Sequence, residues 1–193
     1  LLVAASGIFV LFLAGLSWRL IASAAALAVP LVAFAWNFLL HDYQRTRVLT
    51  LFNPEADVQG AGWNIIQSKT AIGAGGLTGK GYLEGTQSHL HFLPEGHTDF
   101  IIAAFSEEFG LLGVILLMFI YACVLMRALY IAFSHPDVYS RLLAGAIAMS
   151  FFVYVFVNVG MVGGILPVVG VPLPFISYGG TAIVTLMAGF GLL

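Results

Sequence analysis

The last 52 residues of the chain, 142–193, contain no charged side chain. A membrane-spanning helix needs about 20 apolar residues, because each residue adds about 1.5 Å and the hydrocarbon core is about 30 Å thick. This tail is therefore too long for one span and predicts at least two. Pro167, Pro172 and Pro174 mark the break between them, because proline removes a helix hydrogen bond and restricts the residue before it.

The composition of the rest of the chain supports a membrane protein. Only 8% of the 193 residues are charged and 61% are hydrophobic, whereas soluble domains carry about 25% charged residues. This excludes an ordinary soluble domain, and the scarcity of charge also excludes a disordered chain. The net charge of -2 gives no basic excess for binding nucleic acid. The single cysteine, Cys123, excludes a disulfide framework and a cysteine-based zinc site.

The uncharged runs predict an all-α membrane protein, a polytopic transmembrane helix bundle. It has one long extracytoplasmic loop and a proline-rich break before its last helix. The expected spans are 1–18, 20–40, 100–126, 142–163 and 180–193, and the expected extracytoplasmic loop is 41–99. Arg19, Arg127 and Arg141 flank the short connections, which places those connections in the cytoplasm. Both ends lie inside apolar stretches, so we expect a fragment of a longer chain without a signal peptide.

The chemistry is expected between residues 41 and 108, which hold twelve of the sixteen charged residues and four of the five histidines. A glycine-rich stretch at 73–81 is no nucleotide-binding loop, because a Walker motif needs glycine at 74 and serine or threonine at 81. We expect neither a nucleotide nor a haem cofactor. One hypothesis is that free backbone N–H groups of this stretch, beside Lys69 and Lys80, approach a pyrophosphate; the alternative is a simple turn.

Three histidines of the same region, at positions 89, 91 and 97, are a common type of metal ligand. Their spacing in a loop shows no convergent geometry. We interpret them as exposed or interfacial residues, and the sequence leaves any metal unknown.

Asp99 stands where the charged region re-enters the membrane. Two interpretations are open: it is the N-cap of the next helix, or its carboxylate acts as a general base at the lip of a membrane cavity. Glu107 and Glu108 follow eight and nine residues later. A helix starting at Asp99 would carry them about 12 Å inward, where ionisable groups are costly and usually functional. If the helix starts later, both stay at the interface.

Five blocks of sequence resemble the SEDS family of membrane proteins, in the order that the family shows. They cover nearly the whole chain and are 41–45 (HDYQR), 67–73 (QSKTAIG) running into 79–81 (GKG), 92–100 (FLPEGHTDF), 107–110 (EEFG) and 168–180 (VVGVPLPFISYGG). The resemblance is closer to the branch of cell elongation and rod shape than to the division branch. It implies about ten spans, of which this chain is the C-terminal half.

The resemblance also implies an activity and a location. It implies a peptidoglycan glycosyltransferase that polymerises the lipid-linked disaccharide lipid II on the outer face of the bacterial cytoplasmic (inner) membrane. The family's catalytic aspartate falls on Asp99. The implied partners are a class B penicillin-binding protein, a transpeptidase of the PBP2 type, and other membrane proteins of the elongation complex. His91 departs from the family, because relatives often carry an acidic residue there.

This chemistry is compatible with a single aspartate. Transfer from an α-linked pyrophosphate donor to form a β-1,4 bond inverts the anomeric carbon, so it needs one base on the acceptor hydroxyl. The pyrophosphate leaves once its charge is stabilised by a divalent cation, Mg²⁺ or Mn²⁺, or by basic side chains. The candidates for binding pyrophosphate or glycan are Arg45, Arg47, Lys69, Lys80, Glu95, His97, Glu107 and Glu108. Alternative functions are a flippase for the lipid-linked precursor and a non-catalytic scaffold for a transpeptidase.

Overall fold

A computed structural model describes residues 7, 10–11, 14–15, 17–38, 41–57, 60–85, 96 and 98–193. These residues form helices joined by turns and loops, with no strand among them. The helices are α2 (Trp18–Phe38), α3 (Asp42–Phe52), the 3-10 helix η1 (Pro54–Asp57), α4 (Ala61–Gly75), α6 (Ile101–Ser134), α7 (Val138–Val162) and α8 (Gly180–Gly191). The predicted all-α class is confirmed.

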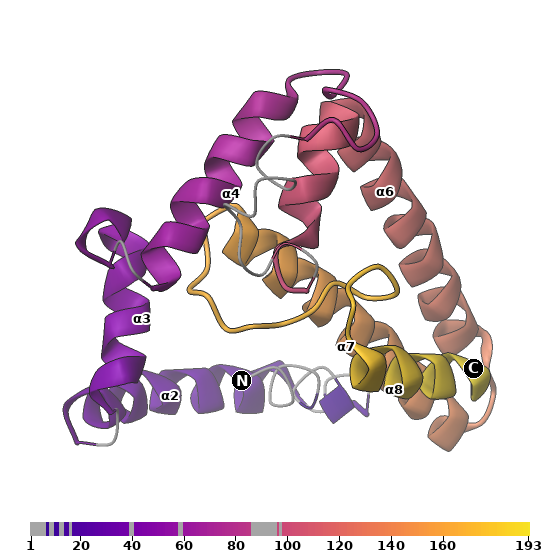
Figure 1. Ribbon diagram of the computed structural model, residues 1–193. Coiled ribbons are helices and arrows are strands. Elements are labelled where there is room, and N and C mark those ends of the chain that lie inside the picture. The colour runs from indigo at the N-terminus through magenta and orange to yellow at the C-terminus, as the bar shows by residue number, and fades with distance from the viewer. Residues whose placement is uncertain are drawn as a thin grey trace.

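The helices form an open, triangular arrangement (Figure 1). Helices α4 and α6 meet at the top of the view, α2 lies along the base, and α3 joins α2 to the lower end of α4. Helix α7 runs behind the centre and packs against α6, and the buried side chains of Phe100, Phe151 and Met161 belong to the core between these elements. The chain from residue 163 to 179, which we call the connecting segment, crosses the middle of the triangle in front of α7.

Within the part of the chain that the structure describes, two helices, α6 and α7, are long and apolar enough to cross a membrane. Helix α6 continues beyond the expected span 100–126, and the Arg127 guanidinium lies over the ring of Tyr130, 5.5 Å from its centroid. It ends at Ser134, since His135 precedes a proline and is extended. Helix α7 starts four residues earlier than expected because Asp137 is its N-cap.

The Asp137 cap has a clear electrostatic signature. The Ser140 backbone N–H, 2.9 Å from Oδ2, and then the Ser140 hydroxyl donate to the carboxylate. These bonds hold the pKa of Asp137 below its usual range.

The region expected as one long loop contains much of the helical structure. Helix α3, η1 and α4 all lie between residues 42 and 75. One face of α4, carrying Ile65, Ser68 and Ala71, is buried, and the spacing of three residues between them is that of a single helix face. The Ser68 hydroxyl donates to the Val162 carbonyl at 3.0 Å, which fixes α4 to the end of α7.

Helix α6 is sharply bent at Gly110, where φ is 65° and ψ is -167°. Its two arms, 101–109 and 111–134, diverge from the top of the molecule (Figure 1). The bend interrupts the helical hydrogen bonds, and the turn that follows α4 replaces them. Leu111 and Leu112 donate to the carbonyls of Gly76 and Leu77.

The carbonyls of α6 that the bend leaves without a helical partner accept hydrogen bonds from the same turn. The N–H groups of Lys80 and Gly81 donate to the carbonyls of Glu107 and Glu108, at 3.0 and 3.1 Å. We call residues 76–81 together with 107–112 the apex junction. A methyl group on Gly79 would overlap the Glu108 carbonyl, so the junction requires glycine there.

The connecting segment is held by side chains from the spanning helices. Tyr121 of α6 donates its hydroxyl to the Pro174 carbonyl at 2.7 Å. The backbone N–H of Leu173 donates to the Ser177 hydroxyl at 2.7 Å. The predicted break before the last helix thus has a defined conformation. Helix α8, after it, has 12 residues, which is about 18 Å of helix.

Candidate active site

Asp99 lies directly before the first arm of α6 and is half-buried. It is not the N-cap, because that position falls on Phe100, whose side chain makes no cap hydrogen bond. The prediction of Asp99 as a cap is therefore wrong. The physical reason is that Ala103 closes the first turn onto the Phe100 carbonyl at 2.9 Å, so the helix begins one residue later than the aspartate position requires.

The Asp99 carboxylate lies against the connecting segment. A methyl group built on Gly170 would be 3.2 Å from Asp99 Oδ2, closer than most side chains tolerate. Gly170 also has a positive φ of 75°, a conformation that glycine adopts at little cost. The absence of a side chain at this position leaves room for the carboxylate.

A buried asparagine of α7 joins the same two segments. Asn158 has no exposed surface, and its Nδ2 donates to the carbonyls of Asp99 at 2.8 Å and Val171 at 2.7 Å. Sequence reasoning missed this residue. The signal was available, because a carboxamide deep in an uncharged run must find partners or lose stability.

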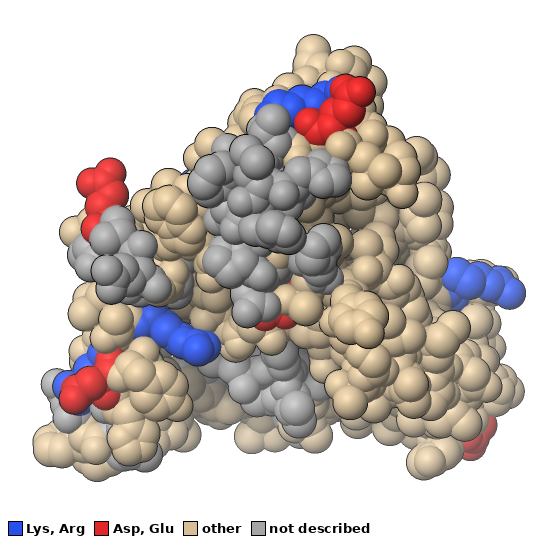
Figure 2. Space-filling model, viewed as in Figure 1, with Lys and Arg blue, Asp and Glu red and all other residues tan. Residues whose placement is uncertain are grey.

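Two of the four candidate basic residues contact the connecting segment from other helices. Arg47 of α3 donates from Nη1 to the Val168 carbonyl at 3.3 Å. Lys69 of α4 lies against Gly164, where a built methyl group would be 2.7 Å from Nζ. Arg45, two residues before Arg47 on α3, is half-buried. Arg47 from α3, Lys69 from α4 and Asp99 from directly before α6 thus all contact one stretch of the connecting segment, residues 164–170, which we call the strip. On the face shown in Figure 2, most side chains are uncharged, and Lys and Arg lie on the left, over α3, and also at the top and at the right edge.

Lys80, the fourth candidate, is in a different environment at the apex junction. Its Nζ forms an ion pair with Glu107 Oε1 at 2.7 Å. The Lys80 and Gly81 N–H groups donate to α6, and that of Gly79 donates to Gly75. The hypothesis that these N–H groups are free to bind a pyrophosphate is therefore wrong. A bent helix with unused carbonyls competes for the same donors.

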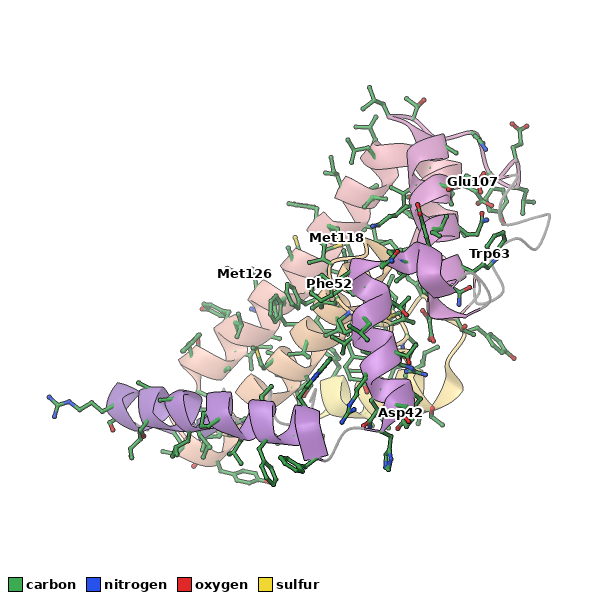
Figure 3. All side chains as sticks on the ribbon, turned by 90° about the vertical axis from the view of Figure 1, so that its left-hand side faces the viewer. Asp42, Phe52, Trp63, Glu107, Met118 and Met126 are labelled. Carbon is green, nitrogen blue, oxygen red and sulfur yellow. The ribbon has the colours of Figure 1, made fainter. Side chains whose placement is uncertain are left out.

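Glu107 and Glu108 lie at the end of the first arm of α6. The Glu107 side chain is fully buried and paired with Lys80, and Figure 3 shows it at the upper end of the molecule, beside the glycine-rich end of α4. Glu108 is half-buried. Among the described residues, the side chain recorded next to Gly170 is that of Asp99 and not of Glu107 or Glu108. Glu107 has a structural role as the partner of Lys80.

The remaining candidates, Glu95 and His97, lie outside the described residues, as do the histidines at 89 and 91. Across the described residues, no three His, Cys, Asp or Glu side chains converge to hold a metal ion.

These features define a polytopic α-helical membrane protein with one carboxylate and two basic side chains gathered on a glycine-containing strip. The whole chain, residues 1–193, matches the family of cell-cycle proteins FtsW, RodA and SpoVE. The chain belongs to this family, which is the SEDS family that its motifs resemble.

Curated relatives carry names that indicate one activity. The chain is 59% identical over 192 residues to peptidoglycan glycosyltransferase MrdB of Escherichia coli K12, covering 100% of this chain and 52% of that protein. It is 44% identical over 155 residues to peptidoglycan glycosyltransferase RodA of Treponema pallidum, covering 80% of this chain and 36% of the relative. The chain thus spans about half the length of the curated relatives it matches.

The fold has a solved counterpart. A chain of a peptidoglycan synthase complex, described as showing structural coordination of polymerization and crosslinking, superposes with a TM-score of 0.80 at 32% identity. The match covers 99% of this chain and 52% of that chain. The helical arrangement in Figure 1 is therefore that of a known membrane-protein fold.

Proposed function

We propose that this chain forms the base-carrying half of a peptidoglycan glycosyltransferase that polymerises lipid II. The observation that carries the proposal is the Asp99 carboxylate, set against Gly170 on a strip that also receives Arg47 and Lys69. The 59% identity to a relative named as a peptidoglycan glycosyltransferase supports the same conclusion.

In the proposed reaction, Asp99 is the general base. It removes the proton from the acceptor hydroxyl as the hydroxyl oxygen attacks the anomeric carbon of the donor, and the bond from that carbon to the pyrophosphate oxygen breaks. The lipid pyrophosphate departs with the bonding electrons. A single base is sufficient because the leaving group is a stabilised anion and, unlike a sugar alkoxide, needs no paired acid.

The charge on the leaving pyrophosphate requires cations. Arg47 and Lys69 approach the strip from α3 and α4, and positioned cations of this kind stabilise developing negative charge. A divalent cation such as Mg²⁺ or Mn²⁺ can arrive with the substrate, since pyrophosphate is itself a ligand for hard cations.

The activity test is glycan polymerisation by purified full-length protein supplied with lipid II. We expect long glycan strands, and addition of a chelator is expected to slow their formation if a divalent cation accompanies the substrate. Polymerisation unchanged by chelation would remove the cation from the proposal. A folded full-length protein that makes no glycan under any tested condition would contradict the proposed activity.

The proposed location is the bacterial cytoplasmic membrane, with the Asp99 region on its outer face. Arg127 and Arg141 flank the connection between α6 and α7, and short basic connections face the cytoplasm. The two ends of a span lie on opposite sides, so the apex junction and the connecting segment face outward.

We further propose a class B penicillin-binding protein of the PBP2 type as partner, within the cell-elongation complex. The structural counterpart is a complex that coordinates polymerization with crosslinking, which supports this pairing. Full-length protein purified in mild detergent is expected to co-elute with such a transpeptidase and to polymerise faster in its presence. Separate elution together with an unchanged rate would contradict the pairing.

A further inference from the structure

We propose that Asn158 is a positioning residue that holds Asp99 in place against the connecting segment. The proposal rests on the proposed function of Asp99 as the base. Asn158 itself touches no reacting atom; it acts through the backbone of Asp99.

The orientation of the Asn158 amide follows from its neighbours. Both nearby partners, 2.7 and 2.8 Å away, are backbone carbonyls, and carbonyls only accept hydrogen bonds. The NH₂ group must therefore face them, and both of its donors are used. Asn158 Oδ1 is buried and accepts no hydrogen bond from the described residues. The amide is thus placed for its donors, although this leaves its acceptor unsatisfied by the described part of the chain.

The Asp99 carbonyl is available to Asn158 because of how α6 begins. In a continued helix that carbonyl would accept from Ala103. Ala103 instead donates to Phe100, and the Asp99 carbonyl accepts from Asn158 Nδ2 at 2.8 Å. The Asn158 side chain of α7 thus supplies the hydrogen bond that the Asp99 carbonyl would receive in a continued helix.

The second bond fixes the other side of the site. Val171 follows Gly170, the residue on which the Asp99 carboxylate lies, and its carbonyl accepts from the same Asn158 nitrogen. One buried amide therefore joins the residue that carries the base to the strip that faces it. Without this donor, the Asp99 and Val171 carbonyls would each lose a hydrogen bond from a buried side chain.

Misplacement of a catalytic group by about 1 Å can reduce a rate by about 10²-fold. Asn158→Leu removes both donors while keeping the side-chain volume similar. We expect it to reduce kcat for glycan polymerisation by about 10-fold to 10²-fold with KM nearly unchanged, because substrate contacts remain and only the position of the base changes.

The matched control is Tyr121→Phe. It also removes one buried side-chain hydrogen bond to the connecting segment, at Pro174, but makes no contact with Asp99 that the structure records. We expect it to lower thermal stability while leaving kcat within about 3-fold of wild type, since the base stays in place. Asn158→Gln, which retains an NH₂ donor, is expected to recover part of the activity lost in Asn158→Leu.

A second readout, independent of activity, is amide hydrogen exchange of the folded variants. Asn158→Leu is expected to speed exchange at both 99–103 and 170–173, whereas Tyr121→Phe should affect the connecting segment alone. A folded Asn158→Leu protein with wild-type kcat, or with exchange unchanged at 99–103, would overturn the proposal. A loss of kcat equal to that of Tyr121→Phe would do the same. If the wild-type protein makes no glycan, the proposed function fails, and exchange still decides whether Asn158 joins the two segments.

Discussion

Asp99→Asn is expected to reduce glycan polymerisation from lipid II by about 10²-fold to 10⁴-fold, the usual cost of losing a positioned general base. The fold should persist. Asparagine has nearly the same shape as aspartate, and the interaction with Asn158 uses the backbone carbonyl of residue 99, which any residue supplies. Expression, thermal stability and binding to a transpeptidase partner are therefore expected to stay close to wild type.

The control for Asp99→Asn is Glu84→Gln. Glu84 is an exposed carboxylate of the same charged region, and its neutralisation should leave the rate unchanged. A product assay at several enzyme concentrations separates a lower rate from a lower fraction of folded protein. Wild-type polymerisation by Asp99→Asn would show that the base is elsewhere, and Glu108 would be the next carboxylate to test.

The second large effect is expected at the apex junction, and it is an effect on stability. Lys80→Ala removes the ammonium group that neutralises Glu107, a carboxylate with no exposed surface. Breaking a buried ion pair in this way costs about 3 to 5 kcal/mol. Because the Lys80 side chain is 31% exposed, we expect a value near the lower end, about 3 kcal/mol.

The two partners should respond unequally. Glu107→Gln leaves Lys80 charged, but that side chain reaches solvent, so we expect a loss of only about 1 kcal/mol, typical of a weakened hydrogen bond. Thermal unfolding of both variants in one detergent provides the comparison. Equal losses, or a larger loss in Glu107→Gln, would mean that burial of the carboxylate is not what makes the ion pair important.

Much of the fold follows from the sequence because lipid imposes simple rules. A tail of 52 residues without a charged side chain is not compatible with a soluble domain, so the helical membrane class was predictable. The start of α7, by contrast, was placed four residues too late, although Asp137 directly after Pro136 is a typical N-cap position. Nor did the sequence indicate that α6 continues as a helix beyond the expected span 100–126, since a long basic side chain such as Arg127 can lie along a ring and keep its charge in solvent.

The site was predictable only in part. Asp99 was identified through its place at the membrane boundary and the family resemblance, but its neighbours come from segments far apart in sequence. Asn158 and Asp99 are 59 residues apart, and no local pattern links them. The pyrophosphate hypothesis for the glycine-rich stretch, one of its two interpretations, failed for the same reason, because the bend at Gly110 that takes up its N–H groups lies about 30 residues away.

The apex junction also affects how mutational data on this protein should be interpreted. Its principal bonds run from backbone to backbone, and every residue except proline supplies the same N–H and C=O groups. An alanine scan would therefore find Leu77 and Thr78 tolerant and would assign little importance to the turn. The glycine positions and the Lys80–Glu107 ion pair would register. Substitution with proline, which removes the donor, is the kind of change that would expose the contribution of this backbone.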